Sequence, residues 1–170
     1  MSAYFGYRYP APTDREMVYR YEKVKDIYSH VDKCNYTMAV KGEVSANSKG
    51  YFVSPSIVDN PPDDSRIVQE EPFGPIIPLL KWSDEDDVLE RANNTDAGLG
   101  ASVWCKDLDR AERMARCLSA GSVWINSHLD GSPNVPYGGH KLSGIGSEWG
   151  MTGFKAYCNS RSLWKWKKVM

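Results

Sequence analysis

The sequence lacks the features that assign a chain to a membrane, to secretion or to a nucleic acid. No apolar run reaches the roughly 18 residues that a transmembrane helix needs, and the tyrosine-rich start has no signal-peptide hydrophobic core. The 170 residues carry 21 basic and 22 acidic side chains, so the charge gives no argument for nucleic-acid binding. We therefore expect a soluble, cytoplasmic protein that binds neither a membrane nor a nucleic acid.

Cysteine and histidine are sparse and scattered. The thiols are Cys34, Cys105, Cys117 and Cys158, and the imidazoles are His30, His128 and His140. No C-x-x-C pair occurs and the histidines do not have the spacing of metal ligands, so we expect no metal site. Because nothing indicates export, we expect all four thiols to be reduced and structural.

The first half of the chain predicts one long helix and several short strands. After an irregular arm over residues 1–12, Thr13 and Glu16 have the spacing of a Thr-x-x-Glu capping box. Strands are expected over residues 51–58, interrupted by Pro55, and over residues 76–81. The apolar residues that follow the cap at helical spacing predict one buried stripe, formed by Met17, Tyr21, Val24, Tyr28 and Val31.

An acidic segment begins the second half. Ser83 is the expected N-cap of a helix that runs through Ala92, and residues 84–87 place four carboxylates in its first turn. Carboxylates there stabilise the positive end of the helix dipole. A metal-binding acidic cluster is the alternative interpretation.

Residues 101–126 predict a βαβ unit. Strands are expected over residues 101–105 and 122–126, and between them Asp107 caps a helix that Gly121 ends. The apolar face of that helix is formed by Leu108, Ala111, Ala115 and Leu118. Because a βαβ unit has parallel strands covered by its helix, the predicted fold class is α/β with a parallel sheet.

Glycine dominates residues 127–153, where the periodicity stops. A loop of this length is usually functional or indicates a missing neighbour. A final strand is expected over residues 154–168, ending in the basic and aromatic sequence WKWKK. We interpret it as an edge strand protected by lysines, with a membrane- or nucleic-acid-binding tail as the alternative.

Two motifs are candidates for chemistry. GIGSEWG at residues 144–150 has the spacing G-x-G-x-x-x-G and does not follow a strand, so we reject it as a dinucleotide fingerprint. EEPFGP at residues 70–75 holds a carboxylate and an aromatic ring between two prolines, whose φ is restricted. Taken alone, this turn is either ordinary structure or a ligand-facing loop.

Five segments, in order along the chain, resemble the aldehyde dehydrogenase family. They are EEPFGP at 70–75, ANNTDAGLGASVW at 92–104, AGSVWIN at 120–126, PYGGHKLSGIGSEWG at 136–150 and FKAYCNSRSL from 154 onward. The resemblance runs from residue 18 to residue 168 and implies an incomplete catalytic domain of that family. It makes residues 18–153 the partial catalytic domain and residues 154–170 an oligomerisation strand and tail, whereas residues 1–17 have no counterpart.

The resemblance also implies roles for particular residues. Glu71 matches the glutamate that accepts hydrogen bonds from the two ribose hydroxyls beside the nicotinamide of NAD or NADP, and Phe73 matches the ring against the nicotinamide. A carboxylate suits a vicinal diol because each of its oxygens can accept one donor.

Further residues match the substrate side of the family's site. Those at the substrate tunnel or its entrance are Asn126, His128, Leu129, Gly131 and Tyr137. Packing is the alternative role for Tyr137. Glu148 matches a glutamate on a water path near the catalytic base, with structural hydrogen bonding as the alternative.

The catalytic groups of the family have no match in this sequence. The family attacks the aldehyde with a cysteine in a G-Q-x-C stretch and activates water with a glutamate in E-x-G-G surroundings. None of the four cysteines has that neighbourhood, and the adenosine-binding half is missing, which leaves roughly the last third of the family's chain. Loss of a nucleophile costs several powers of ten in rate, so we expect no aldehyde oxidation by this chain alone.

Three interpretations remain. The chain is part of an NAD(P)⁺-dependent aldehyde dehydrogenase, which forms homo- or hetero-oligomers and oxidises an aldehyde to a carboxylic acid. Alternatively, it is a non-catalytic interaction module that adds its terminal strand to a full-length subunit, or a self-standing α/β protein with another ligand. The sequence does not choose between NAD and NADP, because that choice is made at the adenosine ribose. Because parallel strands need both faces covered, we expect the lone chain to expose apolar surface.

Overall fold

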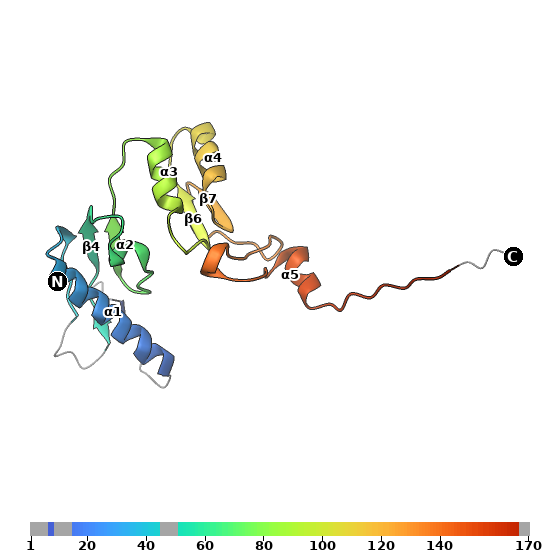
Figure 1. Ribbon diagram of the computed structural model, residues 1–170, viewed down its shortest axis with the longest axis horizontal. Coiled ribbons are helices and arrows are strands. Elements are labelled where there is room, and N and C mark those ends of the chain that lie inside the picture. Colours follow the sequence, from blue (N-terminus) through green and yellow to red (C-terminus); the bar gives the residue numbers. More distant parts are fainter. Residues whose placement is uncertain (1–6, 9–14, 45–50, 167–170) are drawn as a thin grey trace. The chain divides into compact units, whose positions relative to one another are not determined.

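The computed structural model describes residues 7–8, 15–44 and 51–166. The chain divides into two compact units, Met1–Ser83 (unit 1) and Asp84–Met170 (unit 2), and each is described by itself. Figure 1 shows their helices and strands along the chain.

Unit 1 combines one long helix with short strands. Its elements are β1 (Tyr7–Arg8), α1 (Arg15–Cys34), β2 (Met38–Val40), β3 (Phe52–Val53), β4 (Ser56–Asp59), α2 (Arg66–Gln69) and β5 (Ile76–Leu79). The main sheet has the order β2-β4-β5, in which β2 and β4 are antiparallel and β4 and β5 are parallel. A separate antiparallel pair joins β1 and β3, so the expectation of an irregular arm over residues 1–12 was wrong at Tyr7 and Arg8.

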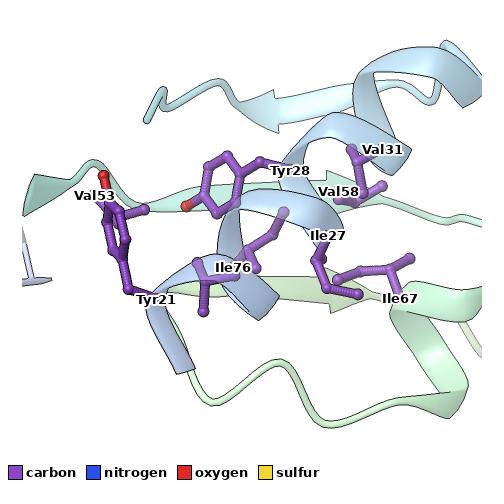
Figure 2. Close-up of a cluster of buried hydrophobic side chains, with 9 residues drawn as sticks. Tyr21, Ile27, Tyr28, Val31, Val53, Val58, Ile67 and Ile76 are labelled. Carbon is purple, nitrogen blue, oxygen red and sulfur yellow. The ribbon is translucent and has the colours of Figure 1, made fainter. Parts of the chain in front are cut away.

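The core of unit 1 lies between α1 and this sheet. The predicted stripe is confirmed for four of its members, which are buried, and Ile27 joins them: Tyr21, Val24, Ile27, Tyr28 and Val31. These side chains pack against Val53, Val58, Ile67 and Ile76, as Figure 2 shows for most of them. Each buried aliphatic side chain contributes about 1.5–3 kcal/mol relative to its exposed state. Thr13, the first residue of the predicted capping box, and the side chain of Met17, the fifth predicted member of the stripe, lie outside the described part of the chain.

Pro55 and Pro78 lie at positions in unit 1 where a strand does not need a backbone N–H, the donor that proline lacks. The predicted break at Pro55 is confirmed, because it separates β3 from β4. The carbonyls of Pro75, just before β5, and of Leu79, its last residue, accept hydrogen bonds from Ser56 N at 2.8 Å and Asn60 N at 2.7 Å. In a parallel pair, alternate residues bond to the same neighbouring strand, so residues 75, 77 and 79 direct their backbone groups towards β4. The backbone of residue 78 points away from β4, and the missing N–H of Pro78 therefore breaks no bond between the two strands.

Unit 2 contains the predicted βαβ unit. Its elements are α3 (Glu85–Asn93), β6 (Gly100–Val103), α4 (Leu108–Cys117), β7 (Ser122–Ile125), a 3-10 turn η1 (Lys141–Ser143) and α5 (Gly150–Ala156). Strands β6 and β7 are parallel and pair from Gly100↔Ser122 to Val103↔Ile125. The prediction of an α/β fold with parallel strands is therefore confirmed.

The helix caps of unit 2 follow the predictions in one case and correct them in the other. Asp107 caps α4, its carboxylate accepting from Arg110 N at 3.0 Å. The cap of α3 is Asp84, which accepts from Asp87 N at 2.9 Å, so the prediction of Ser83 was wrong by one residue. Serine and aspartate are both favourable N-cap residues, so the residue type does not choose between Ser83 and Asp84. The choice depends on where the helical backbone begins, which is at Glu85.

The acidic first turn of α3 is explained by capping and ion pairs. Beyond the Asp84 cap, Glu85 binds Arg110 of α4, and Asp87 lies 3.3 Å from Arg91. Within the described residues, no group of three or more histidine, cysteine or acidic side chains could hold a metal ion.

The sheet-facing side of α4 differs from the prediction at its first residue. Ala111 is fully buried, and Met114, Ala115 and Leu118 are half-buried at helical spacing. Leu108 is 64% exposed, so its assignment to the covered face was wrong. Leu108 is the first residue of α4 and lies one turn before Ala111, the first residue of the covered face.

The end of α4 corrects the role predicted for Gly121. The helix ends at Cys117 with Leu118 as its cap, so Gly121 is too late to be the helix stop. A Cβ at Gly121 would lie 1.7 Å from the carbonyl oxygen of Gly138. The glycine is therefore required by a close approach of two backbone segments.

The predicted C-terminal strand was wrong over its first residues. Phe154–Ala156 belong to α5, and residues 159–166 are extended without a strand assignment. Residues 167 and 168 of the predicted strand lie outside the described residues. A strand needs a neighbour for its backbone hydrogen bonds, and no described residue provides one here. Among the described helices, none is long and apolar enough to span a membrane.

Candidate functional site

The turn over residues 70–75 in unit 1 connects α2 to β5 and presents two candidate side chains. Glu71 is exposed, and the Phe73 ring is 53% exposed. Phe73 has a φ of 51°, a left-handed conformation that is unfavourable for a residue with a bulky side chain. The structure thus brings the two predicted cofactor-binding residues together on one accessible turn.

The paired carboxylates of this turn have different surroundings. Glu70 accepts from Arg66 Nε at 2.7 Å, and the same guanidinium donates to Asp26 at 2.6 Å. The hydrogen bond from Arg66 holds the pKa of Glu70 below its ordinary value. No described residue binds the Glu71 carboxylate. The Glu70 carboxylate therefore contributes to the packing of unit 1, whereas the Glu71 carboxylate has no partner among the described residues.

Helix α1 contacts the other side of the turn. Lys23 Nζ donates to the backbone carbonyl of Glu71 at 3.4 Å, and the Arg20 guanidinium carbon lies 5.1 Å from the centre of the Phe73 ring. Tyr28 donates its hydroxyl to the carbonyls of Ser54 at 2.6 Å and Pro75 at 3.2 Å. Burial raises the pKa of Tyr28, so this phenol remains a donor. Sequence patterns did not reveal Arg20 or Lys23 as partners of the turn.

In unit 2, Asn126 joins the carboxyl ends of the parallel strands. Its Oδ1 accepts from Cys105 N and its Nδ2 donates to the Cys105 carbonyl, both at 2.8 Å. Its φ of 53° is one that asparagine tolerates better than most residues. Both ends of the amide are thus bound to backbone, which holds the start of the following loop.

The next residues of that loop carry an oriented imidazole. His128 Nδ1 lies 2.7 Å from Ser102 Oγ of β6, and its ring meets Trp124 of β7 edge-on with centroids 5.5 Å apart. Leu129, at φ 58°, is largely exposed. The structure therefore places His128 and Leu129 beside each other at the end of the β6–β7 pair.

A second cluster involves Gly131, Tyr137 and Glu148. A Cβ at Gly131 would lie 3.1 Å from the Trp149 ring, whose centroid is 5.5 Å from that of Tyr137. Tyr137 and Glu148 exchange two backbone hydrogen bonds of 2.8 and 2.7 Å. The Glu148 carboxylate itself is exposed. Backbone pairing and aromatic packing therefore shape this loop, and the water-path and tunnel roles stay predictions.

The segment GGHKLS at 138–143 has a structural role that the motif analysis did not identify. Lys141 Nζ donates to the carbonyls of Asn93 at 2.7 Å and Thr95 at 2.9 Å, and Ser143 Oγ accepts from Gly98 N at 2.7 Å. These bonds fasten the glycine-rich loop to the end of α3. The adjacent glycines 138 and 139 were the available signal in the sequence, because segments whose backbones pack closely together require glycine.

The four cysteines are free thiols. Cys34, Cys117 and Cys158 are exposed, and the Cys34 sulfur lies 3.6 Å from His30 Nε2. Cys105 is half-buried, and its backbone is bonded on both sides to the Asn126 amide.

Comparison with known proteins places these elements in a family. The profile described as "Aldehyde dehydrogenase family" matches residues 18–163. Human aldehyde dehydrogenase 1A1 is 40% identical over 144 residues, which are 85% of this chain and 28% of the human protein. Cytosolic aldehyde dehydrogenase 2 of Macroscelides proboscideus is 38% identical over 144 residues, which are 85% of this chain and 60% of that protein.

A solved structure agrees with the sequence comparison. The NAD⁺ complex of an aldehyde dehydrogenase from Bacillus cereus is similar with a TM-score of 0.80 and 37% identity, over 86% of this chain and 30% of that one. The chain thus spans less than a third of the human and bacterial proteins. From its fold, its motifs and these matches over most of its length, this chain belongs to the aldehyde dehydrogenase family.

Proposed function

We propose that this chain supplies the nicotinamide-ribose end of the cofactor site and the substrate entrance of an NAD(P)⁺-dependent aldehyde dehydrogenase. The observation that carries the proposal is the 70–75 turn, where the exposed Glu71 carboxylate and Phe73 ring lie on one anchored loop. The reaction would oxidise an aldehyde to a carboxylic acid.

The side chains of the turn fit this part of the cofactor. Glu71 has two carboxylate oxygens without a protein partner among the described residues, which suits the two hydroxyls of a ribose. The half-exposed Phe73 ring offers an apolar face that limits where a flat heteroaromatic ring can lie. When bound, the nicotinamide accepts the hydride from the substrate. Because NAD and NADP share this ribose, the turn serves either.

The loop residues of unit 2 form the proposed substrate entrance. Asn126 holds the loop by its bonds to Cys105, and His128 and Leu129 are presented next to it. Gly131 and Tyr137 follow at the Trp149 cluster, and Glu148 has the water-path role. In this layout residues 18–153 are part of the catalytic domain and residues 154–170 are the oligomerisation segment.

Nicotinamide mononucleotide tests the cofactor role, because it contains only the part that the turn contacts. In NMR titrations of the full chain, it should shift the amide signals of residues 71–74, whereas adenosine monophosphate should not. Glu71→Gln should weaken binding about tenfold or more, because it removes a charged acceptor. Glu90→Gln, an exposed carboxylate on α3, is the matched control. Equal binding by both variants would refute the assignment of Glu71.

Aldehyde oxidation by the chain itself is expected to be absent. The test follows NAD(P)H absorbance with propanal and benzaldehyde, using the purified 170-residue chain. Turnover that disappears when one of the four free cysteines is replaced would show that this thiol is the nucleophile, contrary to the proposal.

The proposed partners are other aldehyde dehydrogenase subunits, in a homo- or hetero-oligomer. The proposed location is the cytoplasm, and the name of the Macroscelides relative describes that protein as cytosolic. The second candidate function is an interaction module that acts without catalysis. The extended residues 159–166 favour it, since Leu163, Trp164 and Trp166 are exposed and no described strand pairs with them.

Co-purification with a full-length aldehyde dehydrogenase subunit tests this second candidate. Truncation after Cys158 keeps α5 whole and removes the extended segment. The module requires that the intact chain co-purifies and the truncated chain does not. Retention of both, or of neither, argues against it.

A further inference from the structure

The carboxyl end of α1 carries a thiol beside an imidazole, and neither group has a role in the proposed function. Cys34 is the last residue of the helix and is exposed, and its sulfur lies 3.6 Å from His30 Nε2. His30 precedes Cys34 by four residues, so the two side chains lie on one face of the helix. Cys34 is therefore not an isolated thiol, because a nitrogen base lies within hydrogen-bonding distance of its sulfur.

A phenol also interacts with this sulfur. Tyr36 follows Cys34 by two residues and packs against the core of unit 1, which holds its side chain in place. Between them, Asn35 ends the helix in the left-handed conformation, at a φ of 53°. A hydrogen bond with Cys34 raises the pKa of Tyr36, so the phenol stays protonated and can donate to a negatively charged sulfur. Cys34 thus has an acceptor for its proton and a donor for the sulfur that remains.

Cys117 provides a matched comparison within the same chain. It is the last residue of α4, as Cys34 is of α1, and both thiols are exposed. The carboxyl end of a helix disfavours an anion, so a thiolate at either place needs a positive partner. Four residues before Cys117 stands Arg113, which is exposed and cannot accept a proton. In the part of the chain that the structure describes, the base beside the sulfur therefore distinguishes Cys34 from Cys117.

We propose that Cys34 is a modification site at which low-molecular-weight disulfides form a mixed disulfide with this chain, with His30 as the base. His30 Nε2 takes the thiol proton, and the Cys34 sulfur attacks one sulfur of the disulfide. The new S–S bond forms as the old one breaks, and the released thiolate takes the proton from His30. The Cys34 sulfur is oxidised and the leaving sulfur is reduced, so no further oxidant is needed. A second thiol reverses the step.

The test exposes the full chain to glutathione disulfide, with EDTA present, and measures the modification rate of each cysteine by peptide mass spectrometry. Near pH 7.5 an ordinary exposed thiol is about one-tenth ionised, so an adjacent base can raise its rate by no more than about tenfold. Cys34 should therefore react about three- to tenfold faster than Cys117. Dithiothreitol should remove the added group, as expected of a mixed disulfide.

Two substitutions separate the base from other causes of reactivity. His30→Gln keeps a polar side chain without a basic nitrogen, and should slow Cys34 to the rate of Cys117 while leaving Cys117 unchanged. The amide signals of α1 check that this variant stays folded. Arg113→His places an imidazole four residues before Cys117 and should speed its reaction about threefold or more. This second variant changes unit 2, so it tests the thiol–imidazole pair independently of any loss of structure in unit 1.

Three results would overturn the proposal. They are equal rates for Cys34 and Cys117 in the wild-type chain, an unchanged Cys34 rate in folded His30→Gln, and an unchanged Cys117 rate in Arg113→His. Tyr36→Phe removes the donor but keeps the base, so it should slow Cys34 less than His30→Gln does. The opposite order would contradict the role of His30 as the base.

Discussion

Units 1 and 2 each contain a parallel strand pair, but their interiors differ. In the described part of unit 1, nine hydrophobic side chains are buried in the core around α1. In unit 2, the described residues that are buried are Gly98, Ala111 and Gly153, which have little or no side chain. Similar local elements thus lead to a hydrophobic core in one unit and to close backbone packing in the other.

The covering helix explains the difference. Helix α1 is 20 residues long and carries tyrosine, valine and isoleucine on its inner face. The 10-residue α4 buries only the small Ala111 among its described residues, and Met114, Ala115 and the C-cap Leu118 stay half-buried. Parallel strands are normally covered on both faces. Unit 2 also exposes large apolar side chains, namely Leu142, Ile145, Met151, Phe154 and Tyr157. We therefore expect unit 2 to need further protein surface, and the human and bacterial relatives are more than three times as long as the part matched here.

The largest expected effect is in the core of unit 1. Ile27→Ala removes buried methyl groups from a fully enclosed site and should destabilise unit 1 by about 2–5 kcal/mol. Leu118→Ala in unit 2 should cost less, because that side chain is only half-buried. Hydrogen exchange of amides in each unit measures both effects, and equal losses would contradict the comparison.

The second effect tests whether unit 2 depends on backbone packing. Gly121→Ala places a methyl group against the Gly138 carbonyl and should destabilise unit 2 by about 1–3 kcal/mol, the usual cost of overpacking. Ser119→Ala, whose side chain is exposed, is the neighbouring control. Exchange rates of the β6 and β7 amides report the result, and a harmless Gly121→Ala would mean that the two segments separate easily.

A smaller effect separates the correct helix cap from the predicted one. Asp84→Ala should destabilise α3 by about 1 kcal/mol, because the Asp87 N–H loses its acceptor. Ser83→Ala should leave α3 unchanged. Amide exchange at Asp87 and Val88 measures the difference, and the reverse order of effects would restore Ser83 as the cap.

The smallest effect is a pH dependence in unit 1. Arg66 holds the pKa values of Glu70 and Asp26 below their ordinary values by hydrogen bonding to both. A carboxylate with a depressed folded pKa stabilises the fold above its unfolded pKa and loses that contribution as pH falls through the folded value. Between roughly pH 5 and pH 3, wild type should lose more free energy of unfolding than Arg66→Met. Parallel pH slopes for the two proteins would show that the ion pairs contribute nothing.

Local patterns predicted the elements whose cause is local. The three-four spacing from Tyr21 to Val31 specified the buried side of α1, and Asp107 specified the start of α4. The strand-helix-strand pattern of residues 101–126 predicted the parallel β6–β7 pair, and the EEPFGP motif placed Glu71 and Phe73 on one turn. The predicted strand from Phe154 failed because apolar residues of high strand propensity form a strand only where a neighbour offers hydrogen bonds.

By itself, the sequence determined the periodic faces, the βαβ order and the family, because these depend on residue type and spacing along the chain. Tertiary structure alone decided which of Glu70 and Glu71 is bound and what holds Phe73, since Arg66, Arg20 and Lys23 reach them from other elements. The close approach of Gly121 to Gly138 was likewise decided there. Contacts between distant residues depend on how helices and strands pack, and no local pattern in the chain records that packing.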